Sequence, residues 1–205
     1  MRHGARILLG GLAGSLLAAL LAAAPALGAG ELKFASTPAL PTLPGVTLNA
    51  KSQIVSTTMT NISISDTTLS KAGWNVAVQG QSGGVHSAVF AQYCPKAKCG
   101  AQSEGYIAGG SKMAANSLTF NSTGASFTGG GGGAPTFQCA SSCNIDSTSA
   151  VKIASAATGG AGALTWTSTG LSPTSLKLAV PTTLKALPSE DVYRVNILWT
   201  LSTGP

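Results

Sequence analysis

Residues that could act as a general acid or a general base are few in this chain, although serines are many. Beyond residue 30 the sequence has one histidine, His86, in a run typical of a strand, and a half-exposed strand position is a simpler interpretation for it than a general base. The carboxylates in the chain are Glu31, Asp66, Glu104, Asp146, Glu190 and Asp191. Glycoside hydrolysis needs two carboxylates about 5 to 10 Å apart across a cleft, which spacing along a chain does not establish.

Three of these carboxylates are typical of turns. Glu190 and Asp191 follow Leu187-Pro188-Ser189 and are predicted to form a polar turn before the last strand. Asp66 precedes two threonines and is predicted to accept a hydrogen bond from turn backbone. We therefore predict that the protein is not an enzyme and uses no cofactor.

The four cysteines form two close pairs, Cys94 with Cys99 and Cys139 with Cys143. Even numbers of cysteines at short spacing in an exported chain indicate disulfides, and we predict pairing within each pair. A four-thiolate zinc site is the alternative. It is disfavoured because the usual two-residue spacing between zinc ligands is missing, so we predict no metal.

Two segments with tryptophan have the alternation of half-buried strands. The last segment runs from Tyr193 to Leu201 and is expected to be one strand, with Tyr193, Val195, Ile197, Trp199 and Leu201 on one face. The segment from Trp74 to Gln79 has the same pattern, with Trp74, Val76 and Val78 inward. Trp166 is expected in the core. We predict that the two alternating segments share a sheet or adjoining layers.

These segments, read as GWNVAVQ and YRVNILWTLSTGP, resemble the two motifs of WxL-type domains of exported bacterial surface proteins. Trp199-Thr200-Leu201 fits the motif as written, whereas Trp74-Asn75-Val76 has valine in place of leucine. The resemblance implies a non-covalent cell-wall-binding module whose binding residues would be Trp74, Val76, Trp199 and Leu201. It also implies that other surface proteins with immunoglobulin-like domains are partners.

The N-terminus is typical of a secretory signal peptide. Arg2, His3 and Arg6 precede the apolar run Ile7 to Ala24, and small residues follow that suit cleavage after Gly28 or Gly30. A membrane anchor is the alternative, but the run is short and interrupted by glycine. We expect a secreted or cell-surface protein with no membrane span after signal removal.

Composition beyond the signal favours an all-β fold. Without Arg2 and Arg6 the chain keeps ten basic and six acidic residues, a net charge of +4 that suits an anionic wall polymer or simple solubility. The basic residues are spread out, so nucleic-acid binding is not expected. Short apolar runs between turn residues predict an immunoglobulin-like antiparallel β-sandwich with long Gly/Ser-rich loops.

Three regions follow from this pattern: a signal peptide at 1–30, an extended proline-containing segment at 31–43, and a WxL-like sandwich domain at 44–205. Strands are predicted at 54–59, 62–65, 74–79, 85–92, 117–120, 151–153, 164–167, 176–180 and 192–201. The glycine run 129–133 and residues 159–162 are predicted to be flexible loops.

The sequence thus predicts an exported protein that binds peptidoglycan or an associated wall polymer without covalent linkage. The alternative is a structural subunit or adhesin that assembles with other surface proteins through open strand edges. A secreted hydrolase is a third hypothesis, for which the sequence offers few suitable side chains.

Overall fold

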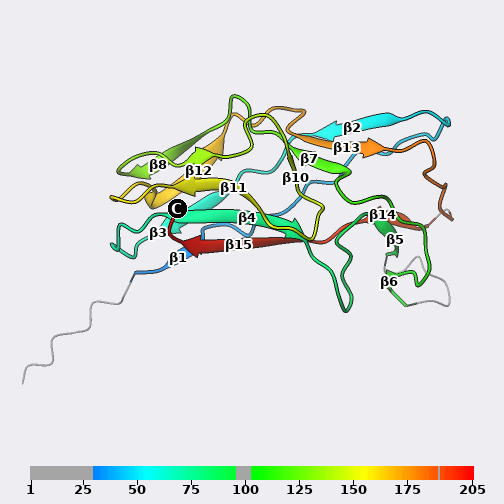
Figure 1. The fold of residues 1–205 in the computed structure, drawn as a ribbon, viewed down its shortest axis with the longest axis horizontal. Helices are drawn as coiled ribbons and strands as arrows, with labels where there is room; N and C mark the ends of the chain where they lie inside the picture. The colour runs from blue at the N-terminus through cyan, green and yellow to red at the C-terminus, as the bar shows by residue number, and fades with distance from the viewer. Residues whose placement is uncertain (1–29, 96–102, 189) are drawn as a thin grey trace, which may run out of the picture.

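The computed structural model describes residues 30–95, 103–188 and 190–205 (Figure 1). Residues 1–29 of the predicted signal peptide, and Cys99, lie outside the described residues. The strands are β1 Leu32–Phe34, β2 Gln53–Thr57, β3 Ser63–Asp66, β4 Trp74–Gly80, β5 Ala91–Cys94, β6 Gly105–Tyr106, β7 Leu118–Phe120 and β8 Ser126–Gly131. They continue with β9 Thr136–Phe137, β10 Cys143–Asn144, β11 Val151–Ala156, β12 Ala163–Thr169, β13 Leu176–Val180, β14 Val192–Arg194 and β15 Ile197–Thr203.

The strands form antiparallel sheets, which confirms the predicted all-β sandwich class. Their orders are β1-β3-β12-β8, β10-β7-β13-β2, β15-β4-β11-β9 and the small sheet β14-β5-β6. Figure 1 shows β4, β15, β3 and β12 toward one end of the molecule and β2, β13, β14 and β5 toward the other. The two ends have different sheets, and both cavities described below lie around β14.

A series of aromatic contacts joins the layers at the centre. The Trp74 ring on β4 meets Phe127 on β8 edge to face at 6.3 Å between centroids. Phe127 stacks on Phe137 of β9 at 4.6 Å, and Phe137 lies 5.9 Å from Phe120 of β7. Aromatic pairs in these geometries add to the stability gained from burial alone. The chain of rings therefore ties three sheets into one core.

Alternation along single strands predicts burial well. Leu176, Leu178 and Val180 of β13 are buried and Lys177 between them is exposed, as alternation along the strand predicted at 176–180 requires. Trp166 is 6% exposed and therefore a core residue, as predicted. Its indole Nε1 donates to the Ala163 carbonyl at 2.8 Å, which satisfies the one polar group of the ring.

The prediction of one continuous last strand is wrong, because the segment forms two strands, β14 and β15. β14 pairs with β5, and β15 pairs with β4. Between them the Asn196 N–H donates to the Ser87 carbonyl at 2.8 Å, and the Asn196 carbonyl accepts from the Gln81 N–H at 2.8 Å. These bonds hold the chain where it crosses from the small sheet to the β4 sheet, so one alternating segment serves two sheets.

The predicted strand over 85–92 is also wrong over most of its length. Residues 83 to 86 form a tight turn with a bridge between Gly83 and His86, and regular pairing begins only at Ala91. Alternation in this segment reflects burial of Ala88 and Phe90 from an irregular backbone. Apolar spacing indicates which side chains are buried and does not by itself require ladder hydrogen bonds.

The glycine run predicted to be a loop belongs largely to strand β8, which pairs with β12. Gly129 lies opposite Trp166, and a Cβ added at Gly130 would lie 1.9 Å from the Trp166 Nε1 atom. Gly130 also has a φ of +53°. The glycines are ordered because a backbone without side chains can lie against the indole ring. The second predicted loop, residues 159–162, lies in a turn over 158–162 before β12.

The N-terminal extended segment joins the sandwich. β1 pairs with β3 in antiparallel register, and Leu40, Leu43 and Val46 pack against the core. The segment from 35 to 50 has no regular strand pairing. Residues before Pro44 therefore contribute to the same body as the residues after it.

Candidate functional site

The two tryptophan-bearing segments lie side by side, as the sequence predicted. β4 and β15 pair so that Trp199 is opposite Val78, Leu201 opposite Val76 and Thr203 opposite Trp74. Residues directly opposite each other share a face of a sheet. Both indoles are therefore on one face of the same strand pair, four residues apart along the ladder.

The predicted binding residues differ in exposure. Trp74 and Val76 have no exposed surface, and the Trp74 Nε1 donates to the Gly162 carbonyl at 3.1 Å inside the core. A ring without exposed surface cannot stack on a polymer. Trp199 and Leu201 lie on the edge strand and are half-buried against the core. Of the residues that the resemblance singles out, only these two present surface to a ligand.

One of the predicted disulfides is confirmed. Cys139 and Cys143 are joined, with Cα atoms 5.4 Å apart, so neither thiolate is free for zinc. Cys94 is also disulfide-bonded, whereas its predicted partner Cys99 lies outside the described residues. In the described segments of the chain no group of His, Cys, Asp and Glu could hold a metal ion.

Asp66 accepts a hydrogen bond from turn backbone, as predicted, and Asp191 lies in the predicted turn before β14. Asp66 Oδ1 accepts from the Thr68 N–H at 3.0 Å and from the Thr68 hydroxyl at 2.7 Å. The Asp191 N–H donates to the Pro188 carbonyl at 3.0 Å, and its carboxylate accepts from Gln92 Nε2 at 2.6 Å.

A polar cleft lies on one face of the small sheet, where sequence reasoning placed no site. It has a volume of about 470 Å³. The side chains that define it are His86, Tyr93, Glu104, Tyr106, Arg194 and Asn196. Tyr93 is opposite Tyr106 in the pairing of β5 with β6. In the pairing of β14 with β5, Arg194 is opposite Ala91, which lies two residues before Tyr93 on the same strand. Pairing across strands β6, β5 and β14 therefore brings Tyr106, Tyr93 and Arg194 to the same face.

The side chains of the polar cleft are ordered by mutual contacts. The two tyrosine rings meet edge to face at 5.1 Å, and the Arg194 guanidinium lies 4.4 Å from the Tyr93 centroid. The Tyr93 hydroxyl donates to Glu104 at 2.6 Å, and the Tyr106 hydroxyl donates to Asn196 Oδ1. These contacts hold hydrogen-bonding groups at fixed positions around the opening.

Both cleft tyrosines stay neutral at physiological pH. The hydrogen bond to Glu104, followed by burial, raises the pKa of Tyr93 above its usual 10.0. Burial raises the pKa of Tyr106 from the same value. A charged phenolate is disfavoured at both positions, so each hydroxyl is kept as a hydrogen-bond donor.

His86 is exposed and ends a tight turn that follows a serine motif. Residues Gly80 to Gly84 have Gly-x-Ser-x-Gly spacing around Ser82, which in hydrolases lies on a strand-to-helix turn. Here β4 ends at Gly80, and a hydrogen bond of 3.1 Å from the His86 N–H to the Gly83 carbonyl closes a turn. Across residues 30–95 no helix occurs, so the setting that this motif needs is missing.

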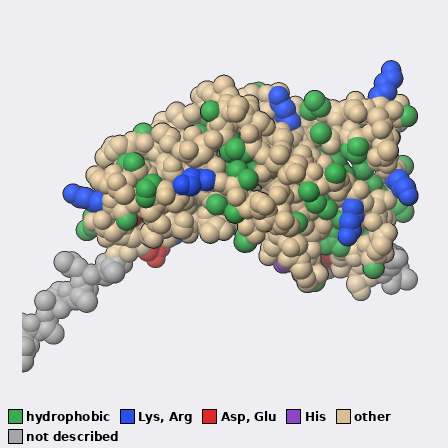
Figure 2. Space-filling view, in the orientation of Figure 1, with side chains coloured by type: hydrophobic (Ala, Val, Ile, Leu, Met, Phe, Trp, Pro, Cys, Tyr) green, Lys and Arg blue, Asp and Glu red, His purple; other side chains and the backbone are tan. Residues whose placement is uncertain are grey.

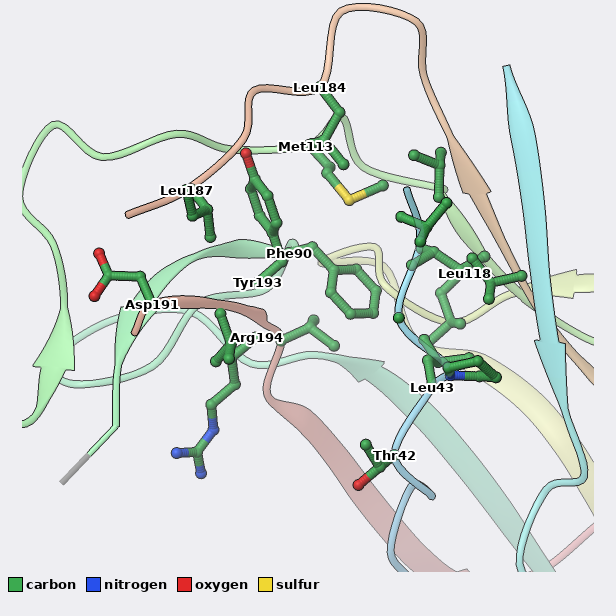
Figure 3. Close-up of a pocket in the computed structure, with 18 of the residues that line it drawn as sticks. Thr42, Leu43, Phe90, Met113, Leu118, Leu184, Leu187, Asp191, Tyr193 and Arg194 are labelled. Atoms are coloured by element: carbon green, nitrogen blue, oxygen red, sulfur yellow. The ribbon is translucent and has the colours of Figure 1, made fainter. Parts of the chain in front are cut away.

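An apolar groove of about 930 Å³ lies on the other side of β14. Leu43, Phe90, Met113, Leu118, Leu184 and Tyr193 define it, and Figure 3 shows Phe90 between Tyr193 and Leu118. Successive residues of β14 face opposite sides, so Tyr193 faces the apolar groove whereas Arg194 faces the polar cleft. Arg194 also lines one end of the groove, which makes it common to both cavities.

Hydrophobic side chains are also visible on the surface at the end of the molecule that has the apolar groove. Figure 2 shows them between Lys and Arg side chains over the end that has β2, β13 and β14, with few acidic side chains on the same face. Ile54 on β2 is 73% exposed. This end therefore combines apolar surface with positive charge.

Comparison with known proteins finds no match to this chain among family models, curated proteins or solved structures. Within the described part of the chain no helix could cross a membrane. The resemblance to WxL domains stays a prediction.

The sequence did not predict the polar cleft, because most of its side chains come from strands β5, β6 and β14 and from Asn196, where the chain crosses between two sheets. One signal was present: two of the three tyrosines in the chain, Tyr93 and Tyr106, flank the Cys94 to Cys99 pair. Arg194 follows Tyr193 in the last segment, so alternation places the two side chains on opposite faces. What Arg194 faces depends on the pairing of β14 with β5.

Proposed function

We propose that this is an exported surface protein that binds a bacterial cell-wall polymer, peptidoglycan or an associated glycan, without covalent linkage. The observation that carries the proposal is the polar cleft, where two neutral phenols, a carboxylate, an amide and a guanidinium surround one opening. Sugars offer many hydroxyl groups, and ordered donors and acceptors of both kinds match them. The WxL resemblance, with its expected secretion, agrees with this proposal.

The charges of the cleft also suit an anionic polymer. Arg194 forms no ion pair with any carboxylate of the described residues, because the one ion pair found there joins Lys33 to Glu31. Its planar guanidinium has several N–H donors beyond the stacking contact with Tyr93. A carboxylate or phosphate group on a wall polymer would therefore find hydrogen-bond donors at Arg194.

Binding is favoured over hydrolysis by the carboxylates of the cleft. Glu104 is the one acidic residue among its described lining residues, and it accepts the Tyr93 hydroxyl. Glycosidases of the usual kinds need two carboxylates on opposite sides of the scissile bond. That the protein is not an enzyme remains a prediction.

Sedimentation with purified cell walls tests the proposal. The wild-type protein should pellet with walls above the level of an unrelated protein, and Arg194→Gln and Tyr106→Phe should weaken binding by about 3- to 10-fold each, the effect of one lost hydrogen bond. Lys177→Gln is a matched control for the loss of a positive charge, since Lys177 is exposed on β13 and lines neither cavity. Wild-type protein that stays in the supernatant would refute wall binding.

The same assay separates the polar cleft from the tryptophan strand. Trp199→Ala removes the half-buried ring on the edge strand without touching the cleft. Weaker binding in Trp199→Ala but not in the cleft variants would move the binding surface to β15, as the WxL resemblance implies. Weaker binding in the cleft variants alone supports the site proposed here.

A second function, assembly through strand edges, is favoured by β2. This strand lies at the end of its sheet order, and Ile54 is 73% exposed on it. An open edge with an exposed apolar side chain can add a strand from another surface protein, including one with immunoglobulin-like domains. Size-exclusion chromatography of wild type and Ile54→Lys tests this, since a wild-type monomer at all concentrations would contradict self-assembly.

A further inference from the structure

The apolar groove has the size and lining of a site for a hydrocarbon. Its volume of about 930 Å³ is within the range of about 300–1,000 Å³ typical of ligand pockets. Figure 3 shows Phe90, Met113, Leu118 and Leu184 turned toward one another across it. The side chains at its centre offer few hydrogen-bonding groups, so a polar ligand would lose contacts with water there without replacement.

Two walls of the groove lack strand pairing. Residues 40–48 make no backbone hydrogen bond to another backbone group in the described chain. In the opposite wall, the Leu184 N–H donates to the nearby Pro181 carbonyl at 3.1 Å, and the Asp191 N–H to that of Pro188. Side-chain bonds from Tyr193 to the Lys185 carbonyl and from Gln92 to Asp191 attach this wall to the small sheet. The groove is therefore bordered on two sides by segments outside the strand ladders.

Charged side chains also line the groove. Lys185 and Arg194 are its basic lining residues and Asp191, whose carboxylate accepts from Gln92, is the acidic one, so the lining has one more positive than negative group. Figure 3 shows the charged ends of Arg194 and Asp191 directed away from Phe90. A ligand with an apolar chain and an anionic group at one end matches this distribution.

We propose that the apolar groove binds the hydrocarbon chain of an anionic glycolipid whose charged group lies at Arg194. Because Arg194 lines both cavities, a sugar attached to that group would extend into the polar cleft. The sugar-binding half of this assignment rests on the proposed function, whereas the chain-binding half rests on the groove alone. The ligand class is therefore a wall glycan that carries a lipid.

Titration calorimetry with n-octyl, n-decyl and n-dodecyl phosphate, each below its critical micelle concentration, tests the groove. Affinity should rise by up to about fourfold for each added methylene, as expected for methylenes that leave water. The alkyl glucoside with the same chain should also bind, but more weakly. Affinity that is independent of chain length, or no binding at all, would overturn the proposal.

Substitutions in the groove test where the hydrocarbon chain binds. Leu184→Asp places a charge in the groove and should weaken dodecyl phosphate binding at least about tenfold. Ile54→Asp makes the same kind of change on an exposed residue outside the groove and should bind as wild type. Leu187→Asp, in the same wall, is a second test should Leu184→Asp fail to fold by circular dichroism. Equal affinity in the groove variants and in Ile54→Asp would exclude the groove as the site.

The contact between the anionic group of the ligand and Arg194 is tested separately. Arg194→Gln should weaken dodecyl phosphate about tenfold and leave dodecyl glucoside nearly unchanged, because only the phosphate gains from the charge. Wall sedimentation without alkyl phosphate binding would overturn the groove assignment and leave the proposed function standing. Alkyl phosphate binding with this pattern supports the groove whether or not the protein pellets with walls. Loss of a wild-type dimer in Leu184→Asp, with no alkyl phosphate binding, would show instead that the groove is a contact between copies.

Discussion

Replacing Gly130 with alanine is expected to destabilise the fold by about 2–5 kcal/mol. Gly130 has a φ of +53°, where an L-residue costs roughly 1–2 kcal/mol. Its added Cβ would lie 1.9 Å from Nε1 and 2.2 Å from Cε2 of Trp166, and forced overpacking of this kind costs about 1–3 kcal/mol. The two costs add because the ring is buried and its Nε1 is held by the Ala163 carbonyl.

Urea denaturation followed by circular dichroism measures this effect. With an m value of about 2 kcal/mol/M, the midpoint of Gly130→Ala should fall by roughly 1–2.5 M. Gly124→Ala is a matched control, since φ at Gly124 is +79° but an added Cβ has open space. It should lose only the backbone part, about 1–2 kcal/mol. Gly45→Ala, which has open space and no positive φ, should be neutral or slightly stabilised.

A double-mutant cycle identifies the cause. If overlap with the indole dominates, Gly130→Ala should cost at least about 1 kcal/mol less in a Trp166→Val background than in the wild type. Equal costs in both backgrounds, or a Gly130→Ala variant no less stable than Gly124→Ala, would refute the argument that the glycine run is shaped by Trp166. In that case the glycines of β8 would be tolerated, not required.

Two further changes test other parts of the core. Asp146 is fully buried, Oδ2 accepts from the Ser117 N–H at 2.9 Å, and burial raises its pKa above 3.8. The Asp146 carboxylate therefore takes up a proton at higher pH in the folded state than in the unfolded state. As the pH falls from neutral through the raised pKa, the wild type should gain stability relative to Asp146→Asn. A stability difference between the two proteins that does not change with pH would contradict this. Replacing Cys139 and Cys143 together by alanine should cost about 2 kcal/mol, the chain-entropy value for so short a loop, and an unchanged thermal midpoint would show that the disulfide adds no stability.

The sequence predicted the features that depend only on the two-residue alternation of side chains along a strand. Alternation placed Leu176, Leu178 and Val180 inside and Lys177 outside, and the density of such runs indicated the all-β sandwich. It also placed Trp166 in the core. A period of two is a property of extended backbone whatever the partner strand, so these features could be inferred without knowing the pairing.

The candidate sites could not be predicted in the same way. Tyr93, Tyr106 and Arg194 meet because β6, β5 and β14 pair in one register, and nothing local to any of the three residues specifies that register. The apolar groove likewise needs segments near residues 43, 113 and 184 to meet. Single-strand patterns carry no information about such distant pairings.

By itself the sequence determined the β class, the buried face of most strands, the close pairing of Cys139 with Cys143 and the approach of the two tryptophan segments. Only the tertiary structure decided that the last alternating segment divides at Asn196, that the glycines of β8 lie against Trp166, and that Arg194 stands between a polar and an apolar cavity. The physical reason is that alternation records which side chains leave water, whereas pairing, crossing and cavity shape depend on hydrogen bonds and packing between residues far apart in the chain.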